Sequence, residues 1–108
     1  MVTENVLKAE DRQLRDYEMV LIISPEVTDE RFNTIIENIS QFITGKGGTV
    51  PEVERWGKRK LAYPIAHFLE GNYVLTRFKM KPTSSKELEA NLRISEEIIR
   101  HLLIRLSG

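Results

Sequence analysis

The stretch "YVLTRFKMK", residues 73–81, decides the fold because its side chains change character at every second position. One side of an extended chain would carry Val74, Thr76, Phe78 and Met80, and the other would carry Tyr73, Leu75, Arg77, Lys79 and Lys81. Alternation with a period of two is typical of a β-strand with one buried face. We therefore expect the Val74 side to lie beneath helices and the Arg77 side to stay open.

A second extended segment, residues 50–65, comes before this strand. Its apolar residues change phase along the segment, and a β-bulge near Trp56–Gly57 would produce that change, because one extra residue exchanges the two faces. The stretch "HFLEGN", residues 67–72, is turn-like around Glu70–Gly71. Two strands joined by a short turn predict a β-hairpin.

Amphipathic helices are predicted on either side of the hairpin. The first has Thr28 as a suitable N-cap and ends in the glycine-rich residues 45–48. The second follows Pro82, which closes the strand, and Ser84 with Glu87 forms a capping box at its start. Apolar side chains of both helices and the strand are expected to form the core: Phe32, Ile35, Ile39, Phe42, Val74, Phe78 and Leu88.

Two further segments complete the pattern. Tyr17–Ile23 is an apolar, β-branched run that predicts a central strand covered on both sides. Residues 98–106 suit either a helix or a strand, and their length and pattern leave both open. If they form a strand, the order β-α-β-β-α-β predicts an antiparallel sheet with both helices on one face. The other face of the sheet would then be free.

The composition fits one domain. The chain has 108 residues, and its sixteen basic and sixteen acidic residues balance, so the total charge does not indicate nucleic-acid binding. It has no cysteine, which excludes disulfides and zinc–cysteine sites. Residues 1–16 are expected to be a flexible or weakly helical extension of a single domain at residues 17–108. With no targeting signal or membrane-spanning run in the sequence, we expect a cytoplasmic protein that does not contact membranes.

The sequence does not indicate catalysis. His67 and His101 are the only histidines, and their spacing suggests neither a metal pair nor a catalytic triad. The acidic pairs at residues 52 and 54 and at residues 96 and 97 are more simply solvated carboxylates beside basic neighbours. We therefore expect no enzyme activity, no cofactor and no small-molecule substrate.

Positive charge is concentrated in "RWGKRKLAYPI", residues 55–65. One interpretation is that these charges protect an exposed edge strand from unwanted pairing. The other is that they hold RNA phosphates, while Trp56 and nearby tyrosines stack or pack against a partner. The apolar residues Leu61, Tyr63 and Ile65 are expected to serve core and strand packing. The residues alone leave both interpretations of the charge open.

Five features make the chain resemble the sixth protein of the bacterial small ribosomal subunit. They are "YEMVLIISP" at 17–25, the glycine-ended helix, "GKRKLAYPI" at 57–65, "EGNYVLTRFKM" at 70–80 and "ELEANLRISEEIIRHLLIRL" at 87–106. The third is the most specific, and the resemblance covers residues 16–106. It implies an α+β, ferredoxin-like fold in which residues 98–106 are the fourth strand. The chain differs from the usual family pattern in having sixteen residues ahead of Tyr17 and no polar tail after Gly108.

The resemblance also implies a function, that of a structural component of the small ribosomal subunit. The protein would bind small-subunit ribosomal RNA in the central domain, at the platform, and would pair with ribosomal protein eighteen as a heterodimer. The candidate RNA-binding residues are Arg55, Trp56, Lys58, Arg59, Lys60, Arg77, Lys79 and Arg93. An alternative of another class is a ferredoxin-like regulatory module that binds a small ligand at a dimer interface.

Overall fold

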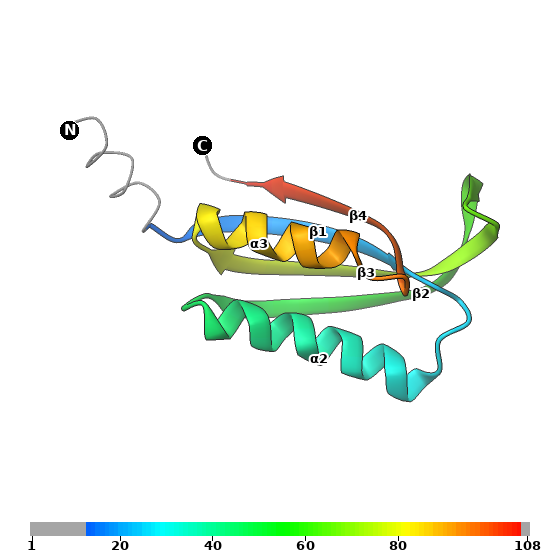
Figure 1. Cartoon of the computed structure of the whole chain (residues 1–108), viewed down its shortest axis with the longest axis horizontal. Coiled ribbons are helices and arrows are strands. Elements are labelled where there is room, and N and C mark those ends of the chain that lie inside the picture. Colours follow the sequence, from blue (N-terminus) through cyan, green and yellow to red (C-terminus); the bar gives the residue numbers. More distant parts are fainter. Residues whose placement is uncertain (1–12, 107–108) are drawn as a thin grey trace.

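The computed structural model describes residues 13–106. Its elements are β1 (Arg15–Ile23), α2 (Asp29–Gly45), β2 (Thr49–Ile65), β3 (Phe68–Met80), α3 (Pro82–Arg93) and β4 (Ile98–Arg105) (Figure 1). This order confirms the predicted β-α-β-β-α-β arrangement, and the ambiguous last segment is a strand. Residues 1–12 of the predicted extension lie outside the described residues.

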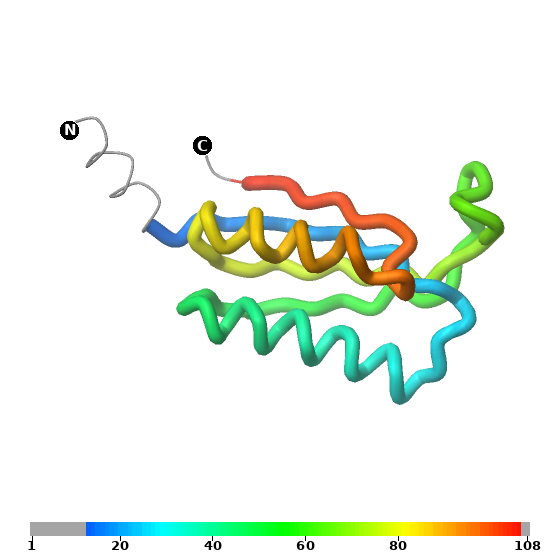
Figure 2. The backbone as a smooth tube through the Cα atoms, in the orientation of Figure 1, coloured from blue at the N-terminus to red at the C-terminus, as the bar shows by residue number. Residues whose placement is uncertain are grey.

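The four strands form one antiparallel sheet in the order β2-β3-β1-β4. Figure 2 shows β1 and β3 between the two edge strands, with the β2–β3 hairpin extending beyond the helices at the right of the view. The fold is therefore the ferredoxin-like α+β fold that the resemblance implied. Within residues 13–106, no helix has the length and apolar character needed to cross a membrane.

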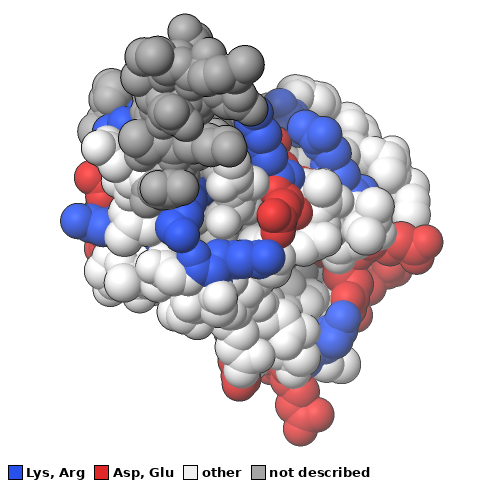
Figure 3. Space-filling model, turned by 60° about the vertical axis from the view of Figure 1, so that its left-hand side comes forward, with Lys and Arg blue, Asp and Glu red and all other residues white. Residues whose placement is uncertain are grey.

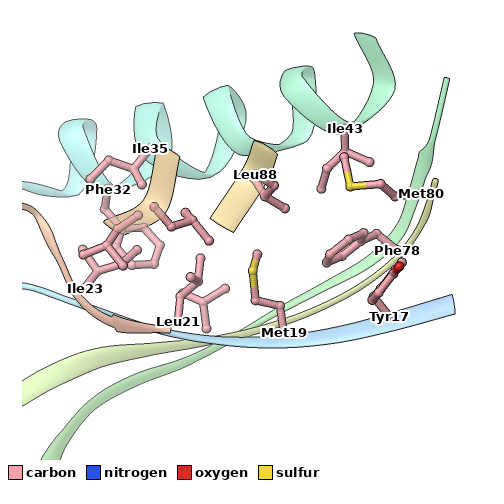
Figure 4. Packing of buried hydrophobic residues seen from close by; sticks show 13 residues of the cluster. Tyr17, Met19, Leu21, Ile23, Phe32, Ile35, Ile43, Phe78, Met80 and Leu88 are labelled. Carbon is pink, nitrogen blue, oxygen red and sulfur yellow. The ribbon is translucent and has the colours of Figure 1, made fainter. Parts of the chain in front are cut away.

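Both helices pack against the same face of the sheet. Figure 4 shows side chains of β1 and β3 pointing toward the helices, where Tyr17 stacks on Phe78 with ring centroids 5.6 Å apart. The buried cluster consists of Tyr17, Met19, Leu21, Ile23, Phe32, Ile35, Ile43, Val74, Phe78, Met80, Leu88, Leu92 and Ile98. Of the predicted core residues, Ile39 and Phe42 are only partly buried and the others are buried.

Helix α2 begins and ends where the sequence predicts. The Thr28 hydroxyl accepts a hydrogen bond from the Arg31 backbone N–H at 3.1 Å, which satisfies one of the free donors of the first turn. After the helix, Gly47 has a φ of 84°. A Cβ at Gly48 would lie 2.2 Å from the Lys79 carbonyl oxygen, so only glycine lets this segment pass β3 so closely.

The predicted start of α3 is wrong. Pro82 lies in its first turn, the N-cap residue is Lys81, and no side chain forms a capping hydrogen bond there. Ser84 is buried inside the first turn, so it does not form the predicted capping box with Glu87. Proline is favoured at this position because its missing N–H would have no helical partner. Pro82 therefore starts the helix as well as following the strand.

The predicted hairpin turn is also wrong. The turn lies at Ala66–His67, and the two strands pair up to the residues on either side of it. Glu70 and Gly71 belong to β3. A Cβ at Gly71 would lie 2.4 Å from Ile22 Cγ2, so this glycine allows β1 and β3 to approach and does not form a turn.

The predicted bulge in β2 is confirmed, and the predicted covering of β1 is corrected. The register of β2 against β3 shifts between Arg55 and Gly57, where Gly57 has a φ of 85°. The prediction that β1 is covered on both sides is wrong, because Glu18 and Val20, on the face away from the helices, are only partly buried. The sheet therefore has one covered face and one open face.

Candidate nucleic-acid interface

The main basic cluster lies on β2, at the edge of the sheet. Trp56 is the extra residue of the bulge and is 39% exposed. The Arg59 guanidinium lies over the Trp56 ring, with its Cζ 5.3 Å from the ring centroid. Lys58 Nζ is 3.9 Å from a Glu70 carboxylate oxygen, and Lys60 is exposed. We call Trp56, Lys58, Arg59 and Lys60 the edge cluster.

The register distributes the edge cluster over both faces of the sheet. Lys58 is opposite Asn72 and Lys60 is opposite Glu70 on β3, so both share the side of those residues. Asn72 is buried and donates a hydrogen bond to the Ser24 carbonyl oxygen, which identifies this side as the helix-covered face. Arg59 therefore points to the open face. A partner lying along the edge could contact charges on both sides of the strand.

Arg55 is not part of this cluster. Its guanidinium lies over the Phe32 ring, 4.0 Å from the centroid, and donates a hydrogen bond of 3.2 Å to Asp29. Both partners belong to the first turn of α2. Arg55 thus covers a buried aromatic ring and ties β2 to the helix, which is a structural role.

Arg77 and Lys79 lie on the open face as predicted, but carboxylates surround them. Arg77 donates hydrogen bonds to Glu18 at 3.0 Å and to Glu52 at 2.8 Å, and these bonds raise the pKa of its guanidinium above the usual value. Lys79 Nζ is 3.8 Å from an Asp16 oxygen. The charge of Arg77 is therefore already compensated by β1 and β2.

Arg93 lies apart from the other candidates. It is in the last turn of α3, on the helix layer, and pairs with Glu89 at 3.3 Å one helical turn away. The structure therefore does not bring Arg93 to the edge cluster.

A metal centre is not formed by residues 13–106, since no three potential ligands gather there. His67 lies at the hairpin turn with its ring centroid 4.2 Å from that of Phe68. His101 is on β4, with Nε2 3.7 Å from a Glu89 oxygen. The two histidines belong to separate parts of the fold.

The open face carries an apolar pocket that the sequence did not predict. It has a volume of about 220 Å³, and its lining includes Val20, Ile22, Leu61, Ala62, Tyr63, Ile65, Tyr73, Arg100, His101 and Leu102. The far end of β2 reaches across to β4, where Arg100 donates a hydrogen bond of 2.6 Å to the Tyr63 hydroxyl. The expectation that Leu61, Tyr63 and Ile65 serve core and strand packing is correct only for the strand: all three lie in β2, but none is buried and Tyr63 is 57% exposed.

A signal for this pocket was present in the sequence. Leu102, Ile104 and Leu106 alternate along the last segment, and the register places Leu102 opposite Val20 and Ile104 opposite Glu18 on the open face. Their exposed fractions are 54%, 43% and 52%. Of the three, only Leu102 lines this pocket. Isolated exposed apolar residues are ordinary, but a contiguous apolar group is typical of an interaction surface.

Comparison with known proteins identifies the family. A family model described as ribosomal protein S6 matches residues 16–105. The small ribosomal subunit protein bS6 of Dehalococcoides mccartyi (strain ATCC BAA-2266 / KCTC 15142 / 195) is 44% identical over 106 residues, which covers 98% of this chain and 97% of the relative. That alignment includes most of the residues ahead of Tyr17. The protein of the same name from Moorella thermoacetica is 42% identical over 93 residues, covering 86% of this chain and 95% of the relative.

A solved structure is similar to the whole described fold. The crystal structure of 30S ribosomal protein S6 from Thermotoga maritima superposes with a TM-score of 0.81 at 36% sequence identity. The superposition covers 87% of this chain and 89% of that chain. Sequence and fold therefore agree on the same group of proteins.

Proposed function

The chain belongs to the ribosomal protein S6 family and is a protein of the small ribosomal subunit; on that premise we propose that it binds small-subunit ribosomal RNA together with ribosomal protein eighteen. The RNA site is in the central domain, at the platform, and the two proteins bind as a heterodimer. The role is structural and not enzymatic, and its location is the ribosome in the cytoplasm.

The observation that carries the RNA assignment is the pairing of Arg59 with Trp56 at an exposed edge. Arg59 holds its guanidinium over the indole ring, and the exposed side chains of Lys58 and Lys60 lie on the other face of the same strand. RNA-binding surfaces combine aromatic rings, on which bases stack, with basic groups that bind phosphates. Because Trp56 is exposed at the bulge and Arg59 lies over its ring, both kinds of group are available along this strand edge.

The open face supports the protein partner. Tyr63 and Leu102 are more than half exposed beside an apolar pocket of about 220 Å³. Apolar surface of this kind is stabilised when a partner removes it from water. The chain has no net charge, so RNA phosphates alone provide little long-range attraction. A second protein that covers the open face would supply the remaining affinity.

Two variants, each measured in two binding assays, test the proposal. The first is Lys58→Ala/Arg59→Ala/Lys60→Ala, and we expect it to bind the central-domain RNA fragment more weakly in the presence of ribosomal protein eighteen. A plot of the logarithm of its RNA-binding constant against the logarithm of the salt concentration should be shallower, by about one unit of slope for each phosphate that the variant no longer neutralises. Its affinity for ribosomal protein eighteen alone should be unchanged. The second is Leu102→Glu, and we expect the reverse: weaker binding of ribosomal protein eighteen.

Controls separate binding from folding. Solvated charges on a strand add about 0–1 kcal/mol to stability, so thermal unfolding of the triple variant should match that of the parent. The variant Lys58→Arg/Arg59→Lys/Lys60→Arg keeps every charge and should retain RNA binding. If the alanine variant binds RNA with unchanged affinity and salt slope, the edge cluster only protects the strand edge. If Leu102→Glu binds ribosomal protein eighteen normally, the open face is not the partner site.

A further inference from the structure

One end of the molecule collects a terminus of each of the six elements, including the start of β2, where Thr49 is opposite Lys79. The start of β1 pairs with the end of β3, because Arg15 is opposite Met80, and with the end of β4, because Tyr17 is opposite Arg105. Helix α3 starts directly after β3, and the end of α2 reaches the same place, since Lys46 pairs with Glu87 at 3.0 Å. In Figure 1 this end is on the left, opposite the tip of the hairpin.

Basic side chains gather at this end. They are Arg15, Lys46, Lys79, Lys81, Lys86 and Arg105, which we call the basic end. Figure 3 brings this side of the molecule forward and shows Lys and Arg side chains around it. Two of these residues form ion pairs with described residues: Lys46 with Glu87 at 3.0 Å and Lys79 with Asp16 at 3.8 Å. Lys86 is exposed and Lys81 half-buried, and neither has a carboxylate partner within the part of the chain that the structure describes.

Acidic side chains gather at the other end. The loops beside the hairpin tip carry Glu26, Glu96 and Glu97, and the first turn of α2 carries Asp29 and Glu30. The first turn of α3, at the basic end, has no acidic residue. Basic side chains lie at that end too, because Arg31 pairs with Glu97, Arg55 pairs with Asp29, and Lys60 of the edge cluster lies beside Glu26. Like charges held close together repel each other and destabilise the fold unless an anion neutralises them.

The basic end is separate from the edge cluster. Lys79 lies at the basic end of β3. Glu70 lies near the other end of β3, where it is opposite Lys60 of the edge cluster in the strand register. The nine residue-to-residue steps from Glu70 to Lys79 extend roughly 30 Å along the strand, at about 3.3 Å per step. A small anion cannot contact both places, but a polyanion with a phosphate at every nucleotide can.

We propose that the basic end is a second phosphate-binding surface, which holds the backbone of the same RNA molecule that the edge cluster contacts. The inference rests on the proposed function, because it assumes that this RNA is the ligand. It adds that the RNA extends along the long axis of the protein and that Lys81 and Lys86 contribute to affinity without reading the base sequence.

The test measures binding of the central-domain RNA fragment, with ribosomal protein eighteen present, at several salt concentrations. For Lys81→Gln/Lys86→Gln we expect roughly three- to tenfold weaker binding at 0.15 M salt and a salt slope shallower by about one to two units. The matched variant Lys81→Arg/Lys86→Arg keeps both charges and should bind as the parent does. Thermal unfolding of both variants should stay close to that of the parent, because Lys86 is exposed and Lys81 is only half-buried.

A second matched variant separates a local contact from an effect of net charge. Glu30→Gln/Glu96→Gln removes two charges of the opposite sign from exposed positions at the other end, and we expect it to change RNA affinity much less than the lysine variant does. If it strengthens binding as much as the lysine variant weakens it, only net charge matters and the proposed contact is wrong. If the lysine variant weakens binding of ribosomal protein eighteen without RNA, the basic end contacts protein and the inference is also wrong.

The edge-cluster variant distinguishes the two hypotheses. If Lys81→Gln/Lys86→Gln binds normally while the edge-cluster alanine variant binds weakly, the second surface does not exist and the proposed function stands. If neither variant changes RNA affinity or salt slope, the RNA-binding function itself fails, together with the inference. A reduced affinity for both, and a further reduction when they are combined, supports two surfaces on one RNA.

Discussion

Two residues of the β2–β3 hairpin have a positive φ, and only one of them is glycine. Gly57, at the bulge, has a φ of 85°, and Ala66, the first residue of the two-residue turn, has a φ of 54°. A side chain in this region brings its Cβ close to the backbone carbonyl, which costs roughly 1–2 kcal/mol. Glycine has no Cβ and adopts both conformations without this cost.

Replacing Ala66 by glycine should therefore stabilise the protein. We expect the Ala66→Gly variant to gain about 0.5–1 kcal/mol, since the relief of strain is partly offset by the greater freedom of glycine in the unfolded chain. Gly57→Ala is the matched control. No atom lies within 4 Å of a Cβ at Gly57, so only backbone strain acts, and we expect a loss of about 1–2 kcal/mol.

Urea unfolding of both variants at neutral pH measures these changes. Equal midpoints for Ala66→Gly and the parent would show that the turn stores no strain. Equal midpoints for Gly57→Ala and the parent would show that the bulge tolerates a side chain.

Neighbours decide the role of each arginine. Arg59 and Arg77 were predicted for one RNA site, yet Arg59 stacks on an exposed indole while Arg77 is held between Glu18 and Glu52. The strand alternation correctly placed Arg77 on the open face. Its two carboxylate partners come from β1 and β2, so their approach depends on the register of three strands, which the sequence pattern does not reveal. The sequence therefore predicted which face of the sheet a candidate residue lies on. It did not predict whether carboxylates already neutralise that residue's charge.

The two helices begin differently, and this difference gives a prediction at the scale of the element. Thr28 accepts a hydrogen bond from the Arg31 N–H at the start of α2, whereas α3 starts at Pro82 with no side-chain cap. Thr28→Ala should destabilise the protein by about 1 kcal/mol, because it leaves a backbone donor of the first turn without this partner. Ser84→Ala removes no capping bond and should cost less.

Circular dichroism during urea unfolding compares the two variants. The reverse order, with Ser84→Ala costing more than Thr28→Ala, would mean that Ser84 stabilises the start of α3 by another contact and that the cap assignment is wrong.

The errors at the level of elements share one physical cause. A glycine near an asparagine was interpreted as a turn at Glu70–Gly71, but Gly71 is required by the close approach of Ile22, a contact from another strand. The real turn at Ala66–His67 lacks the asparagine and glycine residues that usually mark two-residue hairpins. The long amphipathic helix and the alternating strand were predictable because their periodicity is local. Turn positions and close contacts depend on the tertiary structure.

At the scale of the whole molecule, an ion pair ties the first half of the chain to the second. Arg31, in the first turns of α2, donates two hydrogen bonds to the Glu97 carboxylate, from Nε at 2.7 Å and from a terminal nitrogen at 2.5 Å. The Glu97 backbone carbonyl also accepts a hydrogen bond from the Ser24 N–H at 2.8 Å. The segment before β4 is therefore fixed to the end of β1 and the start of α2.

This ion pair makes stability depend on pH in a definite direction. The hydrogen bond from Arg31 holds the pKa of the Glu97 carboxyl below its usual value. A lowered pKa in the folded state means that the ionised carboxylate favours folding. Its contribution is complete above the unfolded-state pKa of about 4.3 and is lost as the pH falls through the lower folded-state pKa. We expect Glu97→Gln to be less stable than the parent at pH 7 and equally stable once Glu97 is protonated in both states.

Urea unfolding of parent and variant from pH 7 to pH 2.5 tests this expectation. Glu96→Gln is the matched control, because it removes the same charge from the adjacent, exposed position, and its stability should follow that of the parent across the range. A difference between Glu97→Gln and the parent that stays constant down to the lowest pH would show that the carboxylate charge does not matter. The contact between the two halves would then depend on the shape of the side chain alone.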